Sequence, residues 1–162
     1  MSESAHEETE RRQLIAQFIL AMRQTTAITQ LLSQAAADRI GINATDLNCL
    51  NIVALTGTMT AGDLARATGL TTASITGVLD RLEDNGLVRR ERDTHDRRKV
   101  IVRLDLTHGL RDVAPVFAPL VTAMRTAAAR YTNGELRLIL RFQLEIEQIV
   151  RDQLASLREK GG

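Results

Sequence analysis

Residues 59–86, MTAGDLARATGLTTASITGVLDRLEDNG, constrain the fold more than any other part of the chain. Thr60, followed three residues later by Asp63, is the capping-box pattern that opens a short helix. Gly69 ends that helix, and Asn85-Gly86 ends a second one. The second helix carries apolar residues at three- and four-residue intervals, namely Ile75, Val78, Leu79 and Leu82. Two short helices separated by a turn that contains glycine predict a helix-turn-helix.

After Gly86 the sequence changes from a helical to an extended pattern. Residues 87–92 (LVRRER) and 99–106 (KVIVRLDL) are rich in apolar and β-branched residues with partial alternation, which predicts two strands. The hydrophilic stretch 93–98 (DTHDRR) between them predicts the tip of a hairpin. A helix-turn-helix followed by a β-hairpin is a winged helix.

Long helices are predicted on both sides of this segment. Residues 8–40 carry apolar residues on one helical face and end at Gly41, after which Thr45 is expected to cap a further helix that ends near Gly57. Helices are also predicted over 110–131 and 135–158, with Asn133-Gly134 as the turn between them. Pro115 and Pro119 are expected to delay the start of the first of these or to kink it.

The predicted fold is therefore mainly α with a small β-hairpin. We expect an N-terminal dimerisation helix over residues 1–42, a winged helix-turn-helix DNA-binding domain over 43–106 and C-terminal dimerisation helices over 107–162, as one structural unit. A single cysteine, Cys49, excludes an internal disulfide and fits a reducing cytoplasm. No stretch approaches the roughly 18 apolar residues of a membrane span, so the protein is expected to be cytoplasmic.

The net charge of the chain is +1, but the basic residues are unevenly distributed. Residues 89–103 hold seven basic and three acidic side chains, which gives +4 over a short span. A local basic cluster of this kind is more informative about nucleic-acid binding than the total charge. The alternative interpretation is a solvated surface loop.

A string of motifs across the winged helix resembles the MarR family of bacterial transcriptional regulators. The matching residues are Asp63-Leu64-Ala65, Gly69-Leu70, Asp80-Arg81-Leu82-Glu83, Gly86-Leu87-Val88, Arg92, Asp93 and Asp96-Arg97-Arg98. The resemblance implies a homodimeric repressor of pseudo-palindromic double-stranded operators. It also implies that a phenolic or other small anionic effector, bound between the dimerisation helices and the winged helix, changes the spacing of the recognition helices.

The helix over 72–84 is the candidate recognition helix. Its predicted outer face is made of small residues, which allow a helix to lie deep in the major groove. Hydroxyl groups at its start, next to free backbone N–H groups, are suited to phosphate. The predicted DNA contacts are Thr71, Thr72, Ala73, Ser74, Thr76, Arg81, Arg97 and Arg98. By the resemblance, Asp96 supports the wing arginines; the directions of Arg89 and Arg90 stay open.

The first helix and the last two carry more apolar surface than one winged helix can cover, which indicates a two-fold homodimer. Arg23 and Thr26 of the first helix, with the neighbouring Thr25 and Thr29, are a weak candidate site for an anionic effector. Solvent exposure of these side chains is the competing interpretation.

Other classes of function are less well supported. The chain lacks a nucleophile elbow and a phosphate-binding glycine loop, so no enzyme and no cofactor are expected. His95 and His108 match no metal-ligand spacing, so no metal site is expected. Cys49 is expected in the core, with a thiol-based redox sensor as the alternative. A winged-helix protein-interaction module without sequence-specific DNA binding is the other alternative.

Overall fold

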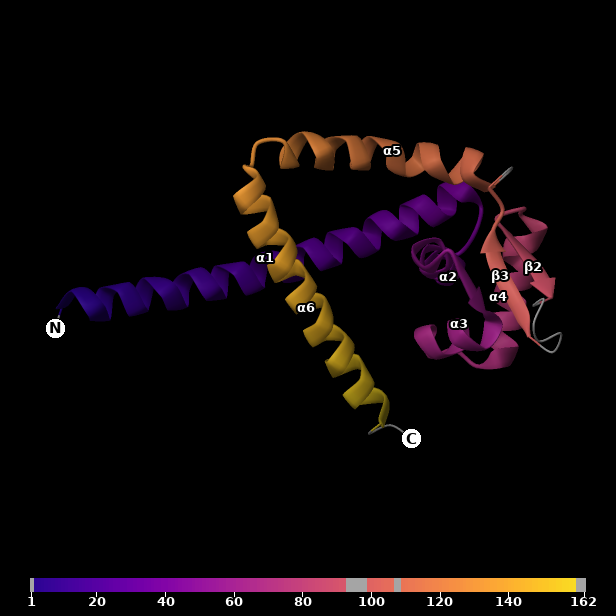
Figure 1. Ribbon diagram of the computed structural model, residues 1–162, viewed down its shortest axis with the longest axis horizontal. Helices are drawn as coiled ribbons and strands as arrows, with labels where there is room; N and C mark the ends of the chain where they lie inside the picture. The colour runs from indigo at the N-terminus through magenta and orange to yellow at the C-terminus, as the bar shows by residue number, and fades with distance from the viewer. Residues whose placement is uncertain (1, 93–98, 107–108, 160–162) are drawn as a thin grey trace. The chain divides into compact units, whose positions relative to one another are not determined.

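The computed structural model describes residues 2–92, 99–106 and 109–159 (Figure 1). The elements in chain order are α1 (Ser2–Ile40), α2 (Ala44–Thr56), β1 (Thr58–Thr60), α3 (Ala61–Thr68), α4 (Thr72–Asp84), β2 (Val88–Arg92), β3 (Val100–Leu104), α5 (Gly109–Ala128) and α6 (Asn133–Glu159). The predicted fold class, mainly helical with a small antiparallel sheet, is confirmed. The chain divides into two compact units, Met1–Phe117 and Ala118–Gly162, with the boundary inside α5.

Helices α3 and α4 form the predicted helix-turn-helix. The Thr60 side chain accepts a hydrogen bond from the Asp63 backbone N–H, and the Asp63 carboxylate accepts one from the Thr60 backbone N–H. The predicted capping box is therefore present. Gly69 ends α3 with φ of 75°, a left-handed conformation that glycine adopts without strain. Thr71 then caps α4, its Oγ1 accepting from the Ser74 N–H at 3.1 Å.

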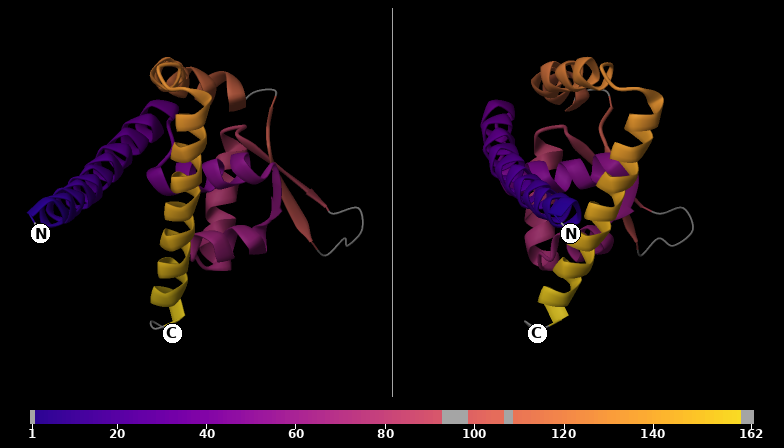
Figure 2. Two further views of the ribbon diagram at one scale, coloured as in Figure 1. Left: turned by 60° about the vertical axis from the view of Figure 1, so that its left-hand side comes forward. Right: turned by 90° about the vertical axis from the view of Figure 1, so that its left-hand side faces the viewer.

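The sheet has three strands in the order β1-β3-β2, one more than predicted. Strand β1 pairs antiparallel with β3, placing Met59 opposite Val102, and β2 pairs on the other side, placing Arg90 opposite Val102. Figure 2 shows β2 and β3 running side by side away from the helices of the same unit. The predicted hairpin tip, residues 93–98, lies outside the described residues.

One hydrophobic core holds the winged helix together. The four predicted inward residues of α4, Ile75, Val78, Leu79 and Leu82, are all buried. They join buried side chains from α1, α2, α3 and the sheet, among them Ala37, Leu47, Leu50, Val53, Leu64, Val88 and Val102. Because this apolar face is fixed in the core, α4 cannot rotate about its axis, and its opposite face is held toward solvent.

One expectation about helix starts is wrong, and of the two effects expected from the prolines one, a delayed helix start, is not found. Asn43, rather than Thr45, caps α2, because its Oδ1 accepts from the Asp46 N–H at 2.8 Å. Helix α5 begins at Gly109, ahead of both Pro115 and Pro119, so the prolines do not delay it. Nearby apolar side chains of α5 pack on the core, which offsets the one hydrogen bond lost at each proline; they are Val113, Val116 and Phe117.

The expected turn at Asn133-Gly134 is also wrong, because both residues belong to the first turn of α6. Thr132 and Glu135 form a second capping box just ahead of it. The Thr132 backbone N–H and hydroxyl both donate to Glu135 Oε2 at 2.7 Å, and the Glu135 N–H lies 3.3 Å from Thr132 Oγ1. These bonds satisfy donors that a helix start otherwise leaves unpaired.

The cap makes the start of α6 sensitive to acid. Hydrogen bonds from the Thr132 backbone and side chain lower the pKa of Glu135 below its ordinary value of 4.5. A carboxylate with a lowered folded-state pKa stabilises the fold above its unfolded pKa and loses that effect as pH falls through the folded value. Thermal unfolding followed by circular dichroism between pH 6 and 3 should therefore show Glu135→Gln less stable than wild type above about pH 4.5, with the difference disappearing in acid. A difference that stays constant with pH would contradict the assignment.

Candidate DNA-binding surface

The outward face of α4 is made almost entirely of small side chains. Thr72, Ala73 and Thr76 are exposed and Gly77 is half-buried, while Asp80 places a carboxylate further along the same face. Small side chains allow the backbone of a helix to approach a partner closely. The burial of the opposite face and the shortness of these side chains together produce a surface that fits a groove about 12 Å wide.

The start of α4 is rich in hydroxyl groups. Thr71 Oγ1 and Ser74 Oγ lie 2.8 Å apart, and both residues are exposed. The Thr76 hydroxyl donates to the Thr72 carbonyl oxygen at 3.0 Å. No acidic residue occupies the first turn, so the partial positive charge of the helix N-terminus is not neutralised there. This end of the helix is suited to a negatively charged partner.

Arg81, also predicted to contact DNA, is held by a residue of another helix. Its Nε and Nη2 donate to the two carboxylate oxygens of Asp46 in α2 at 2.9 Å and 2.7 Å. Asp46 is 1% exposed and also accepts from Asn43 Nδ2 at 2.9 Å. The hydrogen bond to Asp46 raises the pKa of Arg81 above its ordinary value. Sequence reasoning missed Asp46, because 35 residues separate it from Arg81.

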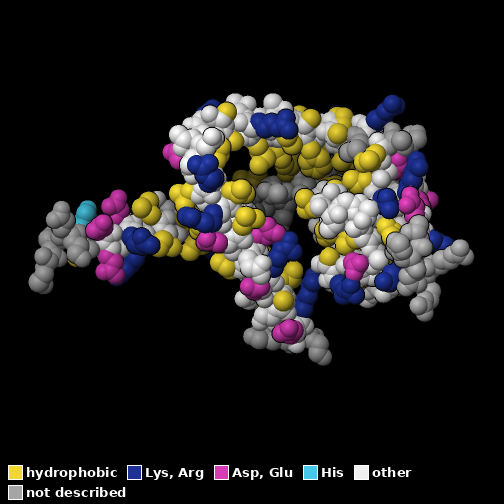
Figure 3. Space-filling model, viewed as in Figure 1, with side chains coloured by type: hydrophobic (Ala, Val, Ile, Leu, Met, Phe, Trp, Pro, Cys, Tyr) yellow, Lys and Arg dark blue, Asp and Glu magenta, His cyan; other side chains and the backbone are white. Residues whose placement is uncertain are grey.

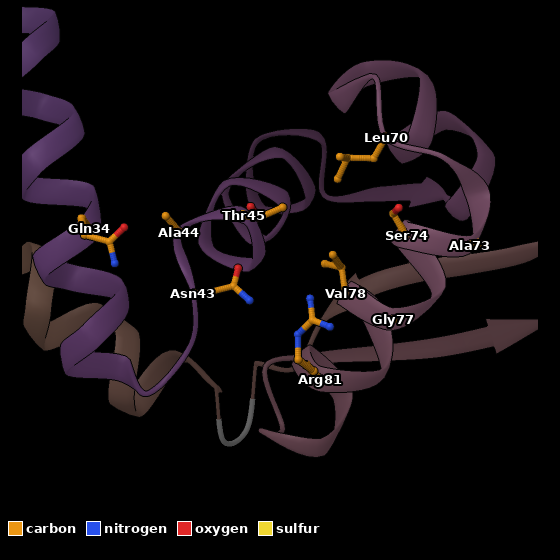
Figure 4. A pocket seen from close by; sticks show the side chains of 10 residues that line it. All are labelled: Gln34, Asn43, Ala44, Thr45, Leu70, Ala73, Ser74, Gly77, Val78 and Arg81. Carbon is orange, nitrogen blue, oxygen red and sulfur yellow. The ribbon is translucent and has the colours of Figure 1, made fainter.

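A groove of about 600 Å³ opens between α4 and the start of α2. Figure 4 shows the side chains of Asn43, ahead of α2, and Arg81, on α4, pointing into the same space. The residues that line the groove are Gln34, Asn43, Ala44, Thr45, Leu70, Ala73, Ser74, Gly77, Val78 and Arg81. The recognition face of α4 and the clamped arginine therefore border one continuous hollow.

Two arginines of the basic cluster at the strands form ion pairs within the protein. Arg89 Nε donates to Asp105 at 2.7 Å, and Arg90 pairs with both Asp80 and Glu83 of α4. These two arginines, whose directions the sequence left open, thus brace the sheet and the recognition helix. The Arg92 side chain is exposed. Three predicted wing residues, Asp96, Arg97 and Arg98, lie outside the described residues.

The residues of α1 predicted to contact an effector form hydrogen bonds within the helix. Arg23 and Thr26 are exposed. The hydroxyls of Thr26 and Thr29 donate to the carbonyls of Met22 and Thr25 at 3.0 Å and 2.8 Å. Their donor hydrogens are therefore used inside the helix.

Cys49 is fully buried beneath α4, as predicted, and its environment disfavours the thiolate. Burial, followed by the nearby Asp46 carboxylate, raises the pKa of the Cys49 thiol to about 11, although Arg81 acts in the opposite direction. We expect a thiol-specific reagent to label the native protein only as fast as it unfolds, and the wild-type protein to keep its DNA affinity after treatment with peroxide, as Cys49→Ser does. Rapid stoichiometric labelling of the folded protein would instead support the redox-sensor alternative.

The described residues hold neither a metal-binding cluster nor a membrane-spanning helix. In residues 2–92, 99–106 and 109–159, no group of three or more His, Cys, Asp or Glu side chains is arranged to hold a metal ion. His95 and His108 lie outside those ranges. No helix in the described part of the chain combines the length and hydropathy needed to cross a membrane.

The helix-turn-helix, the hairpin and the small-residue face of α4 define a winged helix-turn-helix DNA-binding protein. The profile of the MarR family matches residues 42–100. An uncharacterized HTH-type transcriptional regulator, YcgE of Bacillus subtilis (strain 168), is 39% identical over 131 residues, which is 81% of this chain and 84% of that protein. The chain belongs to the MarR family: it is a DNA-binding transcriptional regulator and not an enzyme.

Solved structures show the same fold. A MarR family protein from Bacillus stearothermophilus has a TM-score of 0.65 and 23% identity, covering 86% of this chain and 97% of that one. A mutant of the S. aureus protein MepR, bound to an oligodeoxyribonucleotide, has a TM-score of 0.54 and 18% identity, again covering 86% and 97%. At this identity the likeness extends to the fold alone.

Proposed function

We propose that the protein is a repressor that binds a pseudo-palindromic operator as a homodimer and is released by a small anionic or aromatic ligand. The observation that supports this most strongly is the geometry of α4. Its apolar face is fixed in the core, and its small, hydroxyl-rich face borders an open groove. In this proposal Thr71, Thr72, Ala73, Ser74 and Thr76 lie at the major groove, and Arg97 and Arg98, braced by Asp96, reach the minor groove.

The homodimer is proposed from the apolar surface of the flanking helices. On the face seen in Figure 3, hydrophobic side chains lie among charged ones along both α1 and α6. No described residue of α6 is buried within the chain. The exposed large apolar residues of this helix are Leu138, Ile139, Leu140, Phe142, Leu144, Ile149, Val150, Leu154 and Leu157. Surface of this extent favours burial against a second copy, and a two-fold dimer presents two recognition helices to a palindrome.

The effector is the least specified part of the proposal. A second cavity, lined by residues of α2, α5 and the sheet, measures about 70 Å³. This is below the roughly 300–1,000 Å³ of ligand pockets. Arg23 remains the proposed contact to an anion, whereas Thr26, whose hydroxyl donates to the Met22 carbonyl, has no hydrogen left to donate to it. A panel of aromatic acids should include one that weakens operator binding, and unchanged affinity across the panel would remove this part of the proposal.

The test of the function is selection of binding sites from a random duplex library, followed by titration of the enriched sequence against a scrambled duplex. Specific protein–DNA affinity typically exceeds non-specific affinity by about 10³–10⁷. We expect enrichment of an inverted repeat, bound by two chains. Failure to enrich any sequence would favour a winged-helix protein-interaction module.

The wing can be tested separately with Arg98→Ala. We expect operator affinity to fall by about tenfold, because one contact to the nucleic acid is lost, while the midpoint of thermal unfolding stays within error of wild type. Fluorescence anisotropy at several salt concentrations measures the first quantity, and differential scanning calorimetry the second. Wild-type affinity in this variant would show that Arg98 makes no contact with DNA.

A further inference from the structure

We propose that Asp46 is a positioning residue for DNA binding, which holds Arg81 so that the free edge of its guanidinium meets a DNA phosphate in the groove between α2 and α4. The inference rests on the proposed function and deepens it, since it assigns a role to a helix outside the helix-turn-helix. Asp46 itself is too deeply buried to touch DNA, and therefore acts only through Arg81.

The Asp46 carboxylate and the Arg81 guanidinium form a two-point contact. Oδ2 receives Nε at 2.9 Å and Oδ1 receives Nη2 at 2.7 Å, which fixes the plane of the guanidinium. Asn43 Nδ2 donates to the same carboxylate at 2.9 Å and holds it in place from the other side. The carboxylate is thus orientated by α2 and by the residue that caps it.

The opposite edge of the guanidinium is available to a partner. The Arg81 side chain is 50% exposed and lines the groove. Its Nη1 lies over Gly77, at 3.5 Å from the position that a Cβ would take there. A Cβ at that distance would be in ordinary van der Waals contact with Nη1, so this edge of the guanidinium lies directly beside the small-residue face of α4.

The other residues of the groove favour an anionic partner. Gln34, Asn43, Thr45 and Ser74 contribute uncharged polar groups, and Arg81 is the one charged residue among the described side chains that line it. A phosphodiester accepts hydrogen bonds from amides, hydroxyls and a guanidinium in the same way. An arginine whose orientation is already fixed in the free protein loses less conformational freedom on binding than a mobile one. The clamp thereby sets the position of the phosphate relative to α4.

A double-mutant cycle tests this inference with the operator that the selection experiment yields. Arg81→Ala should weaken binding about tenfold and reduce the slope of log affinity against log salt by about 1, because one phosphate contact is lost. Asp46→Asn should weaken binding about threefold to tenfold with an unchanged salt slope, because Arg81 keeps its charge but not its orientation. The double variant should bind like Arg81→Ala alone, since Asp46 acts through Arg81.

Arg151→Ala is the matched control, because this α6 arginine also pairs with a carboxylate, that of Glu147, with Nε at 3.0 Å. Its affinity and salt slope should equal those of wild type. If Asp46→Asn does not fold, Arg81→Lys is the substitute test. Lysine keeps the positive charge but cannot form the two-point contact with the Asp46 carboxylate. Arg81→Lys should bind the operator as weakly as is expected for Asp46→Asn, with an unchanged slope of log affinity against log salt.

Two outcomes would overturn the inference while leaving the function intact. Arg81→Ala could bind the operator with wild-type affinity and slope, or the effects of the two single variants could add in the double variant. Loss of preference for the operator in wild type would instead overturn the proposed function itself.

Discussion

Thr72→Glu is expected to lower operator affinity by at least about a hundredfold, because a carboxylate at the start of α4 faces the phosphates. The same change should leave the stability of the protein unchanged or higher. Thr72 is exposed, its position in the first turn holds no acid, and a negative charge there favours the helix by about 0.3–1 kcal/mol. Fluorescence anisotropy and urea unfolding of the same sample measure the two effects. A loss of operator affinity without a loss of stability would show that the variant affects DNA contact and not folding.

Asn133→Glu is the control for this prediction. It introduces the same charge in the first turn of α6, where the helix dipole is also favourable but no DNA contact is proposed. Its operator affinity should stay within about twofold of wild type. Equal losses in both variants would indicate a general charge effect, and no loss in Thr72→Glu would remove the start of α4 from the interface.

The double variant Ile139→Asp/Ile149→Asp is expected to be monomeric and to lose about 10²–10⁴-fold in operator affinity. The two side chains are 49% and 61% exposed in the single chain, so the isolated fold should tolerate the change. In the proposed dimer they are buried, and a buried unpaired carboxylate is strongly unfavourable. A monomer binds only one half-site, so it loses the gain in affinity that comes from linking two recognition helices in one dimer. Analytical ultracentrifugation gives the mass, and anisotropy the affinity.

Leu55→Asp provides the comparison, since Leu55 is 88% exposed at the end of α2, outside the flanking helices. This variant should remain dimeric and bind the operator. A double variant that is still dimeric would place the contact between copies elsewhere than on α6.

The winged helix was predictable because its signals are local. Thr60 with Asp63 marks the start of α3, Gly69 its end, and Asn85-Gly86 the end of α4, each through a cap that a few neighbouring residues form on their own. The inward face of α4 followed from the spacing of its apolar residues. Once the inward residues of α4 are known, the other residues of the helix must face solvent, and these make up most of the candidate site.

What the sequence did not show depends on contacts between distant residues or on competing local signals. Strand β1 has three residues, too few to display alternation, and it exists because β3 pairs with it. The Arg81–Asp46 pair joins helices that no local pattern connects. Asn133-Gly134 favours a turn by itself, but the capping box formed by Thr132 and Glu135 places it inside a helix.

The most direct test of the account is the affinity for two versions of the selected operator, which differ only by five base pairs inserted between the half-sites. A homodimer with two recognition helices on one side of the duplex requires half-sites separated by about one helical turn or a multiple of it. The insertion rotates one half-site by about half a turn, so we predict that two chains bind the original duplex tightly and that the affinity for the inserted duplex falls to that for scrambled DNA. Equal affinity for both duplexes would contradict the proposal that α4 of two paired chains reads the operator.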